Sequence, residues 1–373
     1  MVYGVNPVSG QLDWAAPGVI SRGFGQAWGY FAQYNNVAGS TFNDGQGYNW
    51  QVPSWPRMQT STWGGADIMF RNLSGNVEYM QTGSSAGSYN SLFGNQNVLS
   101  KDTAGEFTQQ TADGTKVVFN SLTSATNPGL MKTRTSPGGT VLTLSGAFGP
   151  NQILDAIRTN TTTSGVVRDE SFLQTFNADG MLSTVVLRRR TDGGVWKNVE
   201  QTTYNYYDGS TAHGSARDLR VCTSQTWSDA GAGGWTASKV SYFRYYKAGD
   251  SGGFEHGLKY AVSPATFVKI QSDGFEPATM TDGQLSLYAD RYFQYDAVTH
   301  RVVNWQLNGG TQSFTLEYSY NPHSVAQPLP FGHWYQKSVL TRQDGSKQIF
   351  YSNFYGMVIL SVLCLLYTSD AAD

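Results

Sequence analysis

The sequence predicts an all-β protein built from antiparallel β-hairpins. Three observations lead to this fold class. Aromatic residues make up 14% of the 373 residues, and 42 residues are glycine. Aromatic side chains favour strands, and glycine is common where a chain turns or bulges between strands. Asp-Gly pairs also recur between stretches in which apolar and polar residues alternate, as expected of hairpins.

Strict alternation of apolar and polar residues marks two segments as strands with one packed and one wetter face. These series are Phe314, Leu316, Tyr318 and Tyr320, and Val303, Trp305 and Leu307. No window shows a sustained helical period. Residues Asn151 to Arg158 come closest, but the run Thr159 to Thr163 that follows favours a strand. We therefore expect little helix.

Three hairpins can be placed at Asp113-Gly114, Asp179-Gly180 and Asp344-Gly345, because Asp-Gly tolerates the positive φ of a two-residue turn. Such turns predict these cross-strand partners: Thr108 with Phe119, Leu173 with Val186, Phe172 with Leu187, Leu340 with Ile349, and Val339 with Phe350. Apolar residues meet across the last two turns, which favours pairing.

The chain divides into three parts by composition. Residues 1–104 are rich in Gly and Trp, including Trp28, Trp50, Trp55 and Trp63, and predict an irregular lead-in or cap. Residues 105–363 carry the continuous hairpin pattern. The last ten residues, 364–373, read CLLYTSDAAD and resemble the translation of a sequencing adaptor. We expect this tail to pack poorly and to contribute nothing to the fold.

The charge of the chain and its lack of targeting signals limit the classes of function that we expect. The net charge is −2, so no overall field favours nucleic acid. The only basic run, Arg188 to Arg190, is expected at a solvated strand end. The chain starts without a signal peptide, and the apolar stretch Met357 to Leu366 is too short for a transmembrane segment. With Cys364 in the tail, Cys222 remains as a buried, inert thiol without a disulfide partner.

Several segments resemble proteins of the RHS/YD-repeat family, whose hairpins carry Tyr-Asp or Phe-x-x-Asp-Gly signatures. FNADGML, from Phe176 to Leu182, is similar to that unit. So is FQYDAVTHRVVNW, from Phe293 to Trp305, in which Tyr295-Asp296 begins a turn that leads to Arg301. The resemblance extends over roughly Gly105 to Leu363.

The resemblance implies a strip of hairpins that curls into a sheet or part of a hollow β-shell. Full-length relatives encase a C-terminal cargo or toxin, or mediate surface contacts. The expected function is a non-catalytic structural shell or surface-interaction fragment, secreted or at the cell surface. Its partners would be its own C-terminal domain, absent from this sequence, or a cell-surface glycan or protein.

Motifs that suggest chemistry are weak in this sequence. Gly83 to Gly87 matches the G-x-S-x-G nucleophile elbow, but a loop follows it where a helix is needed. Gly23, Gly25 and Gly29 fail the dinucleotide-binding spacing. We expect no enzyme activity, no cofactor, and no catalytic or metal-binding residue.

The histidines and carboxylates are expected to serve turns. No two of His213, His256, His300, His323 and His333 have the close spacing of zinc ligands. His213-Gly214 and His256-Gly257 each follow a Tyr-Tyr pair, which predicts a duplicated structural corner. Asp208, Asp218, Asp250 and Glu255 lie among Gly and Ser, where aspartate favours turns.

Two alternative functions remain open. A carbohydrate-binding or glycan-cleaving β-protein would line an open groove with Trp and Tyr beside carboxylates. An outer-membrane β-barrel would need strands of about 9–11 residues with an apolar outer band.

Overall fold

The fold was examined in a computed structural model. It describes residues 4–24, 27–36, 42–61, 67–71, 77–92, 96–146, 152–236, 238–322, 332–354 and 356–364. Strands account for 48% of the chain and helices for 4%, which confirms the all-β class and the small share of helix.

One antiparallel sheet of 23 strands dominates the molecule. Its strands are β6 (Met58–Thr60), β7 (Ile68–Arg71), β8 (Val77–Thr82), β9 (Ser88–Ser91), β10 (Val98–Lys101), β11 (Phe107–Gln110), β12 (Lys116–Phe119), β13 (Met131–Thr135), β14 (Val141–Ser145), β15 (Asp155–Thr161), β16 (Val167–Phe176), β17 (Leu182–Thr191), β18 (Lys197–Tyr206), β19 (Leu219–Ser228), β20 (Gly234–Trp235), β21 (Lys239–Tyr245), β22 (Leu258–Val262), β23 (Arg291–Tyr295), β24 (Val302–Leu307), β25 (Gln312–Tyr320), β26 (Gln336–Arg342), β27 (Lys347–Ser352) and β28 (Val358–Cys364).

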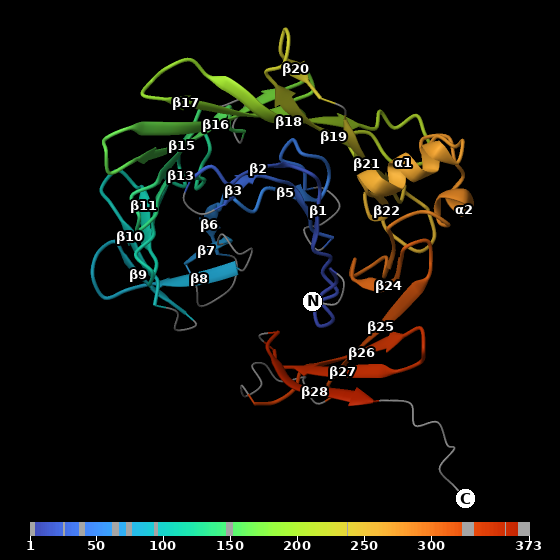
Figure 1. Ribbon diagram of the computed structural model, residues 1–373. Helices are drawn as coiled ribbons and strands as arrows, with labels where there is room; N and C mark the ends of the chain where they lie inside the picture. Colours follow the sequence, from blue (N-terminus) through green and yellow to red (C-terminus); the bar gives the residue numbers. More distant parts are fainter. Residues whose placement is uncertain are drawn as a thin grey trace, which may run out of the picture.

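The strands of this sheet pair in chain order, each with the next, except that β20 and β21 both pair with β19. Among the described residues no strand pairing joins β28 to β6, so the sheet stays open. In Figure 1 the strands follow an arc, with the earliest and the latest strands of the sheet at its two ends. The sheet is therefore a single curved ribbon.

The N-terminal segment lies inside this arc (Figure 1). It forms two small sheets, one of β1 (Trp14–Ala15), β4 (Gln33–Tyr34) and β5 (Trp50–Gln51), and one of β2 (Val19–Ser21) and β3 (Trp28–Tyr30). Buried side chains of this segment belong to the same hydrophobic cluster as those of the large sheet. The main core thus lies between the segment and the concave face of the ribbon.

Two helices cover the outer face of the sheet at one place. They are α1 (Pro264–Ser272) and α2 (Asp282–Leu285), both inserted between β22 and β23. Neighbouring residues of a strand point to opposite faces. Accordingly, Phe243 of β21 joins the inner core, whereas Tyr242 packs with Ile270 of α1 in a separate outer cluster.

The prediction of little helix holds, but no helical period in the sequence indicated this insertion. The Ser263 side chain caps α1, with Pro264 in its first turn, and Thr281 with Gln284 forms a capping box at α2. The stretch Asn151 to Arg158, in contrast, leads into strand β15, as the following threonines indicated.

All three Asp-Gly pairs occupy tight hairpin turns, which confirms their predicted place. The turns hold three residues between their closing pair rather than two. In the first turn, the Thr111 amide donates to the Thr115 carbonyl (3.0 Å) and the Gly114 amide donates to the Thr111 carbonyl (2.9 Å). Gly114 has φ +86°, as the left-handed position after a type I turn requires.

The extra turn residue shifts the strand register by one in two hairpins. Phe119 pairs with Phe107 instead of Thr108. Ile349 pairs with Val339 instead of Leu340, and Phe350 with Ser338 instead of Val339. In the third hairpin a bulge between Thr175 and Phe176 offsets the extra turn residue. The predicted pairs Leu173 with Val186 and Phe172 with Leu187 are therefore confirmed.

Strand β28 is an edge of the sheet. It pairs with β27 and with no other described strand, and its side chains are exposed along its whole length. Residues 365–373 lie outside the described residues, so the expected poor packing of the adaptor-like tail stays a prediction. The division at residue 104 also stays a prediction, although strands of the large sheet begin at Met58.

Candidate functional site: the inner face of the sheet

Aromatic side chains of the N-terminal segment form the contact with the concave face. Trp28 meets Phe172 of β16 edge-to-face at 4.8 Å, and Trp50 meets Phe243 of β21 at 5.4 Å. The Trp50 indole Nε1 also donates to the Tyr245 hydroxyl at 2.9 Å. Edge-to-face pairs of this kind stabilise beyond the area that they bury. Trp28, Trp50 and Trp55 are thus part of the core, and Trp63 lies outside the described residues.

A buried polar cluster ties the same segment to the sheet. The Tyr34 hydroxyl donates to the His256 carbonyl (2.9 Å) and accepts from the Leu258 amide (3.0 Å). His256 Nδ1 lies 2.9 Å from Asp218 Oδ1, and the Tyr48 ring stacks on the imidazole at 3.7 Å. Burial raises the pKa of Asp218, whereas the hydrogen bond to His256 lowers it. Every partner of His256 here belongs to the chain itself, which is typical of a structural histidine.

The Tyr-Tyr corners are a true duplication. The Tyr207 hydroxyl donates to the Phe243 carbonyl (2.8 Å), and the Tyr246 hydroxyl donates to the Phe293 carbonyl (2.7 Å). Each ring packs against a glycine whose Cβ would clash with it, Gly214 and Gly253. The residues in matching left-handed positions are Arg217 (φ 72°) and His256 (φ 69°). His213 and His256 are therefore not equivalent, and the histidine pairing in the sequence is coincidental.

A second duplicated turn joins the N-terminus to the ribbon. In the segments Asn6 to Gln11 and Asp296 to Arg301, the amide of the first residue donates to the carbonyl of the last residue (2.8 and 2.9 Å). The side chain of the first residue accepts from the backbone amides of the second and third residues after it. The predicted turn from Tyr295-Asp296 to Arg301 is thus confirmed. The Val302 amide donates to the Gly10 carbonyl at 3.0 Å, and this hydrogen bond holds one turn against the other.

The remaining carboxylates of the sequence cluster accept hydrogen bonds in the turns where they lie. Asp208 and Asp250 each accept from a backbone amide within three residues at 2.9 Å, and Glu255 accepts from the Ser215 hydroxyl at 2.9 Å. Asp218 is buried with His256 and accepts from the Ser215 amide at 2.8 Å.

His213 and His300 contact neighbouring side chains. His213 Nδ1 lies 3.8 Å from Asp282 Oδ1, and burial together with Arg244 lowers the pKa of His213. His300 stacks on Phe254 at 3.8 Å, and burial lowers its pKa. His323 lies outside the described residues. Among the residues that the structure describes, no group of three or more His, Cys, Asp or Glu is placed to hold a metal ion.

The two glycine motifs have structural explanations. Gly83 to Gly87 forms the turn between antiparallel strands β8 and β9, so the serine is not presented at a strand-to-helix junction. Gly29 lies in β3, where a Cβ would come 2.0 Å from the Val19 carbonyl oxygen. Gly25 lies outside the described residues. Cys222 is buried in β19, and burial raises the pKa of its thiol.

The basic run Arg188 to Arg190 lies at the end of strand β17, as predicted, with Arg189 exposed and its two neighbours half-buried. Each arginine has a carboxylate partner: Arg188 with Asp155 (3.3 Å), Arg189 with Glu170 (2.9 Å) and Arg190 with Asp169 (2.8 Å). Glu170 is buried, also binds Arg158 at 2.5 Å, and accepts from the Ser21 hydroxyl of β2. This network is another tie between the N-terminal segment and the sheet.

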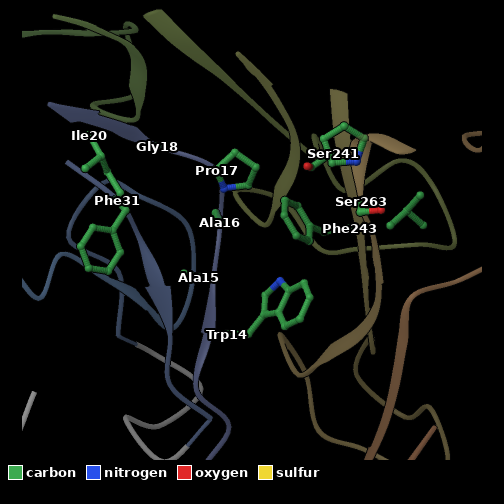
Figure 2. Close-up of a pocket in the computed structure, with 12 residues that line it drawn as sticks. Trp14, Ala15, Ala16, Pro17, Gly18, Ile20, Phe31, Ser241, Phe243 and Ser263 are labelled. Atoms are coloured by element: carbon green, nitrogen blue, oxygen red, sulfur yellow. The ribbon is translucent and has the colours of Figure 1, made fainter. Parts of the chain in front are cut away.

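Several cavities lie where the N-terminal segment meets the ribbon. The first, of about 420 Å³, is almost wholly apolar. Figure 2 shows Trp14 and Phe243 close together on one side and Ile20 and Phe31 on the other, with the backbone from Ala15 to Gly18 between them.

The second cavity, of about 450 Å³, combines polar and aromatic side chains. It lies between residues 42–59 of the N-terminal part, strand β7 and Leu130. Asp44, Arg57, Gln51 and Trp55 are among its lining residues. Sequence reasoning missed this site because its residues come together only through the tertiary fold.

Comparisons with known proteins give structural likeness at low identity. No known protein family and no curated protein matches the sequence. A crystal structure of TcdB2-TccC3-Cdc42 is similar over 64% of this chain and 16% of that chain, with 13% identity and a TM-score of 0.42. A porin-like protein from Bacteroides uniformis ATCC 8492 is similar over 83% of this chain and 94% of that chain, with 10% identity and a TM-score of 0.20.

A structure of TcdB2-TccC3-TEV is similar over 90% of this chain and 24% of that chain, with 9% identity and a TM-score of 0.13. The two TcdB2-TccC3 chains are thus far longer than this one, which spans 16% and 24% of their length in these matches. At these TM-scores the likeness assigns no function. Neither described helix has the length and apolar character needed to cross a membrane.

Proposed function

We propose that this chain is a non-catalytic wall segment of an RHS/YD-repeat-type shell, secreted or exposed at the cell surface. The observation that carries the proposal is the curved ribbon itself, in which strands β6 to β28 follow one another in chain order around the N-terminal segment. A ribbon that adds hairpins at one end and curves steadily is suited to enclosing a volume.

Regular ties between hairpins support the repeat character. Three tyrosines near strand ends donate to the first carbonyl of a neighbouring strand at the same distance: Tyr206 to Leu182, Tyr295 to Leu258 and Tyr318 to Val302, each at 2.8 Å. A repeated tyrosine hydrogen bond fixes the register between successive hairpins, which is what a repeating wall needs.

A structural role also agrees with the partners of the polar groups. The carboxylates and histidines described above form hydrogen bonds and ion pairs within the chain, in its turns and corners, as buried polar groups generally do. We propose on this basis that the chain has no enzyme activity, and that its partner is either a further domain of the same protein or a cell-surface glycan or protein.

The test is to express the full-length product of the gene and to determine its structure by electron cryomicroscopy. We expect further hairpins to pair with the free edge of β28 and to continue the arc around an enclosed space. A product in which β28 remains the last strand, with no enclosed space, would contradict the proposal.

A further inference from the structure

We propose that the cavity between the β2–β3 hairpin and strand β13 binds a small organic oxyanion, whose carboxylate or phosphate group is held by Arg22 and Arg134. This inference is independent of the shell proposal. The cavity has a volume of about 390 Å³, within the usual ~300–1,000 Å³ of small-molecule sites. Three features carry the inference: two arginines without partners, a lining without carboxylates, and an apolar surface beside the arginines.

Arg134 of β13 lines the cavity without a partner of its own. Among the described residues its side chain forms no hydrogen bond and no ion pair. The side chain is half-buried: Nε is shut off from solvent, whereas the two Nη atoms at its tip remain accessible. A guanidinium carries its donors in a planar fork that matches a carboxylate or a phosphate. The Nη atoms are therefore donors available to a ligand.

The row of residues across the sheet from Arg134 holds more arginines than carboxylates. Cross-strand pairing places Leu142 beside Arg134, followed by Arg158, Glu170 and Arg189. The single carboxylate of this row, Glu170, binds Arg158 through one oxygen (2.5 Å) and Arg189 through the other (2.9 Å). Because both oxygens are engaged, Glu170 does not neutralise Arg134.

The surroundings of Arg134 favour a bound anion. Burial lowers the pKa of Arg134, and the positive charge of Arg158 lowers it further, although the carboxylate of Asp113 opposes both effects. Asp113 is held in its own hairpin turn, where its carboxylate accepts from the Thr115 amide at 2.9 Å. An anion placed against the guanidinium would offset the cost of burying its charge.

Arg22 supplies a second positive charge to the same cavity. It lines the cavity, is exposed, and forms no side-chain hydrogen bond or ion pair with any described residue. No Asp or Glu is among the described residues that line the cavity. Two positive charges without a negative one select an anion over a neutral or a cationic ligand.

An apolar surface lies beside the two arginines. Ile20 and Phe31 line this cavity and also the first, apolar cavity. Figure 2 shows these two side chains together, on the opposite side of the backbone from Trp14. Ile20 is 50% exposed although it is apolar. A ligand with an apolar part would cover this surface, which favours an organic anion over an inorganic one.

The experiment measures binding of benzoate, phenyl phosphate and inorganic phosphate to the whole chain by isothermal titration calorimetry. Benzoate and phenyl phosphate distinguish a carboxylate ligand from a phosphate ligand, and benzamide serves as the uncharged analogue of benzoate. We expect at least one of the two organic anions to bind. Inorganic phosphate should bind at least about tenfold more weakly, because it gains nothing from the apolar surface, and benzamide should not bind.

Arg134→Gln and Arg22→Gln should each weaken binding of the organic anion about tenfold or more, the usual effect of losing a charged hydrogen bond. Arg168→Gln is the matched control, because it removes the same charge from an exposed residue of β16 outside the cavity, and it should leave binding unchanged. Circular dichroism establishes that each variant is folded. If Arg134→Gln unfolds the protein, the substitution of the exposed Arg22 decides the outcome.

Three results would overturn the proposal. The first is a folded wild type that binds neither organic anion. The second is benzamide or inorganic phosphate binding as tightly as the organic anions do. The third is folded Arg22→Gln and Arg134→Gln proteins that bind the organic anion as tightly as Arg168→Gln.

Discussion

At the scale of single residues, tyrosine hydroxyls and turn carboxylates determine how one hairpin sits on the next. Tyr246 is fully buried, yet its hydroxyl reaches the Phe293 carbonyl on a strand that follows the helical insertion. Tyr-Tyr pairs were recognisable in the sequence as corners. The partners of their hydroxyls were not, because they lie on strands that become neighbours only in the folded sheet.

Tyr246→Phe removes this hydroxyl and leaves the Phe293 carbonyl without its donor. We expect a loss of about 1–3 kcal/mol in the free energy of unfolding, measured by urea denaturation. The matched control is Tyr320→Phe at an exposed strand end, where the change should be below about 0.5 kcal/mol. Equal effects of the two substitutions would contradict a structural role for the corner.

The side chains of Asp296 and Asn6 each accept two backbone amides in equivalent turns, but only Asp296 can carry a charge. The stability of the Asp296 turn should therefore depend on pH. Hydrogen bonds from the Thr299 amide and hydroxyl lower the pKa of Asp296. The stability that its charge contributes is therefore present above the ordinary aspartate pKa of ~3.9 and is lost as the pH falls through the lower folded pKa.

In Asp296→Asn the turn keeps its acceptor, as in Asn6, but loses the charge. We expect the wild type to be the more stable of the two at neutral pH, and the difference in melting temperature to shrink toward about pH 3. A difference that stays constant across this range would show that the charge of Asp296 contributes nothing.

At the scale of elements, the sequence predicted where hairpins turn but not always how their strands align. Asp-Gly placed all three turns because it tolerates positive φ. The register depended on one more turn residue, and only the bulge at Thr175 and Phe176 restored the predicted pairing in one hairpin. Bulges leave no fixed mark in sequence, so register is the less predictable property.

The helical insertion depends on one buried cation. Arg244 is fully buried and binds the Asp282 carboxylate (2.6 Å) and the carbonyls of Pro277 (2.8 Å) and Met280 (2.6 Å). Arg244→Met should reduce the free energy of unfolding by about 3–5 kcal/mol, because it strands these acceptors. Limited proteolysis should also cut between α1 and α2 sooner than in the wild type.

Lys269→Ala is the control for this prediction. Lys269 forms an exposed ion pair with Asp273 in the same insertion, and such pairs contribute about 0–1 kcal/mol. An Arg244→Met protein as stable and as resistant to protease as Lys269→Ala would rule out the anchoring role of Arg244.

At the scale of the whole molecule, the ribbon is defined by a free edge and a filled concave face. The curved sheet and its antiparallel order follow from patterns visible in the sequence. The position of the N-terminal segment inside the arc does not, because the aromatic contacts that hold it, such as Trp28 with Phe172, join residues far apart in the chain. The cavity between residues 42–59 and strand β7 was unpredictable for the same reason.

The free edge predicts self-association. Val358, Leu360 and Val362 of β28 are exposed, and an exposed apolar edge strand pairs readily with other chains. We expect sedimentation velocity to show oligomers that grow with concentration, and Leu360→Lys to suppress them. Val195→Lys, at an exposed hairpin turn, should not. A wild type that stays monomeric at high concentration would show that β28 is not a usable edge.

The most direct test of this account is removal of residues 1–57, because the account places the core between this segment and the concave face. The shortened chain should lose its cooperative thermal transition or melt far below the wild type. It should also bind the dye ANS strongly, since Phe172, Phe243 and their neighbours would be exposed to water. A shortened chain that melts at the wild-type temperature without binding the dye would contradict the account.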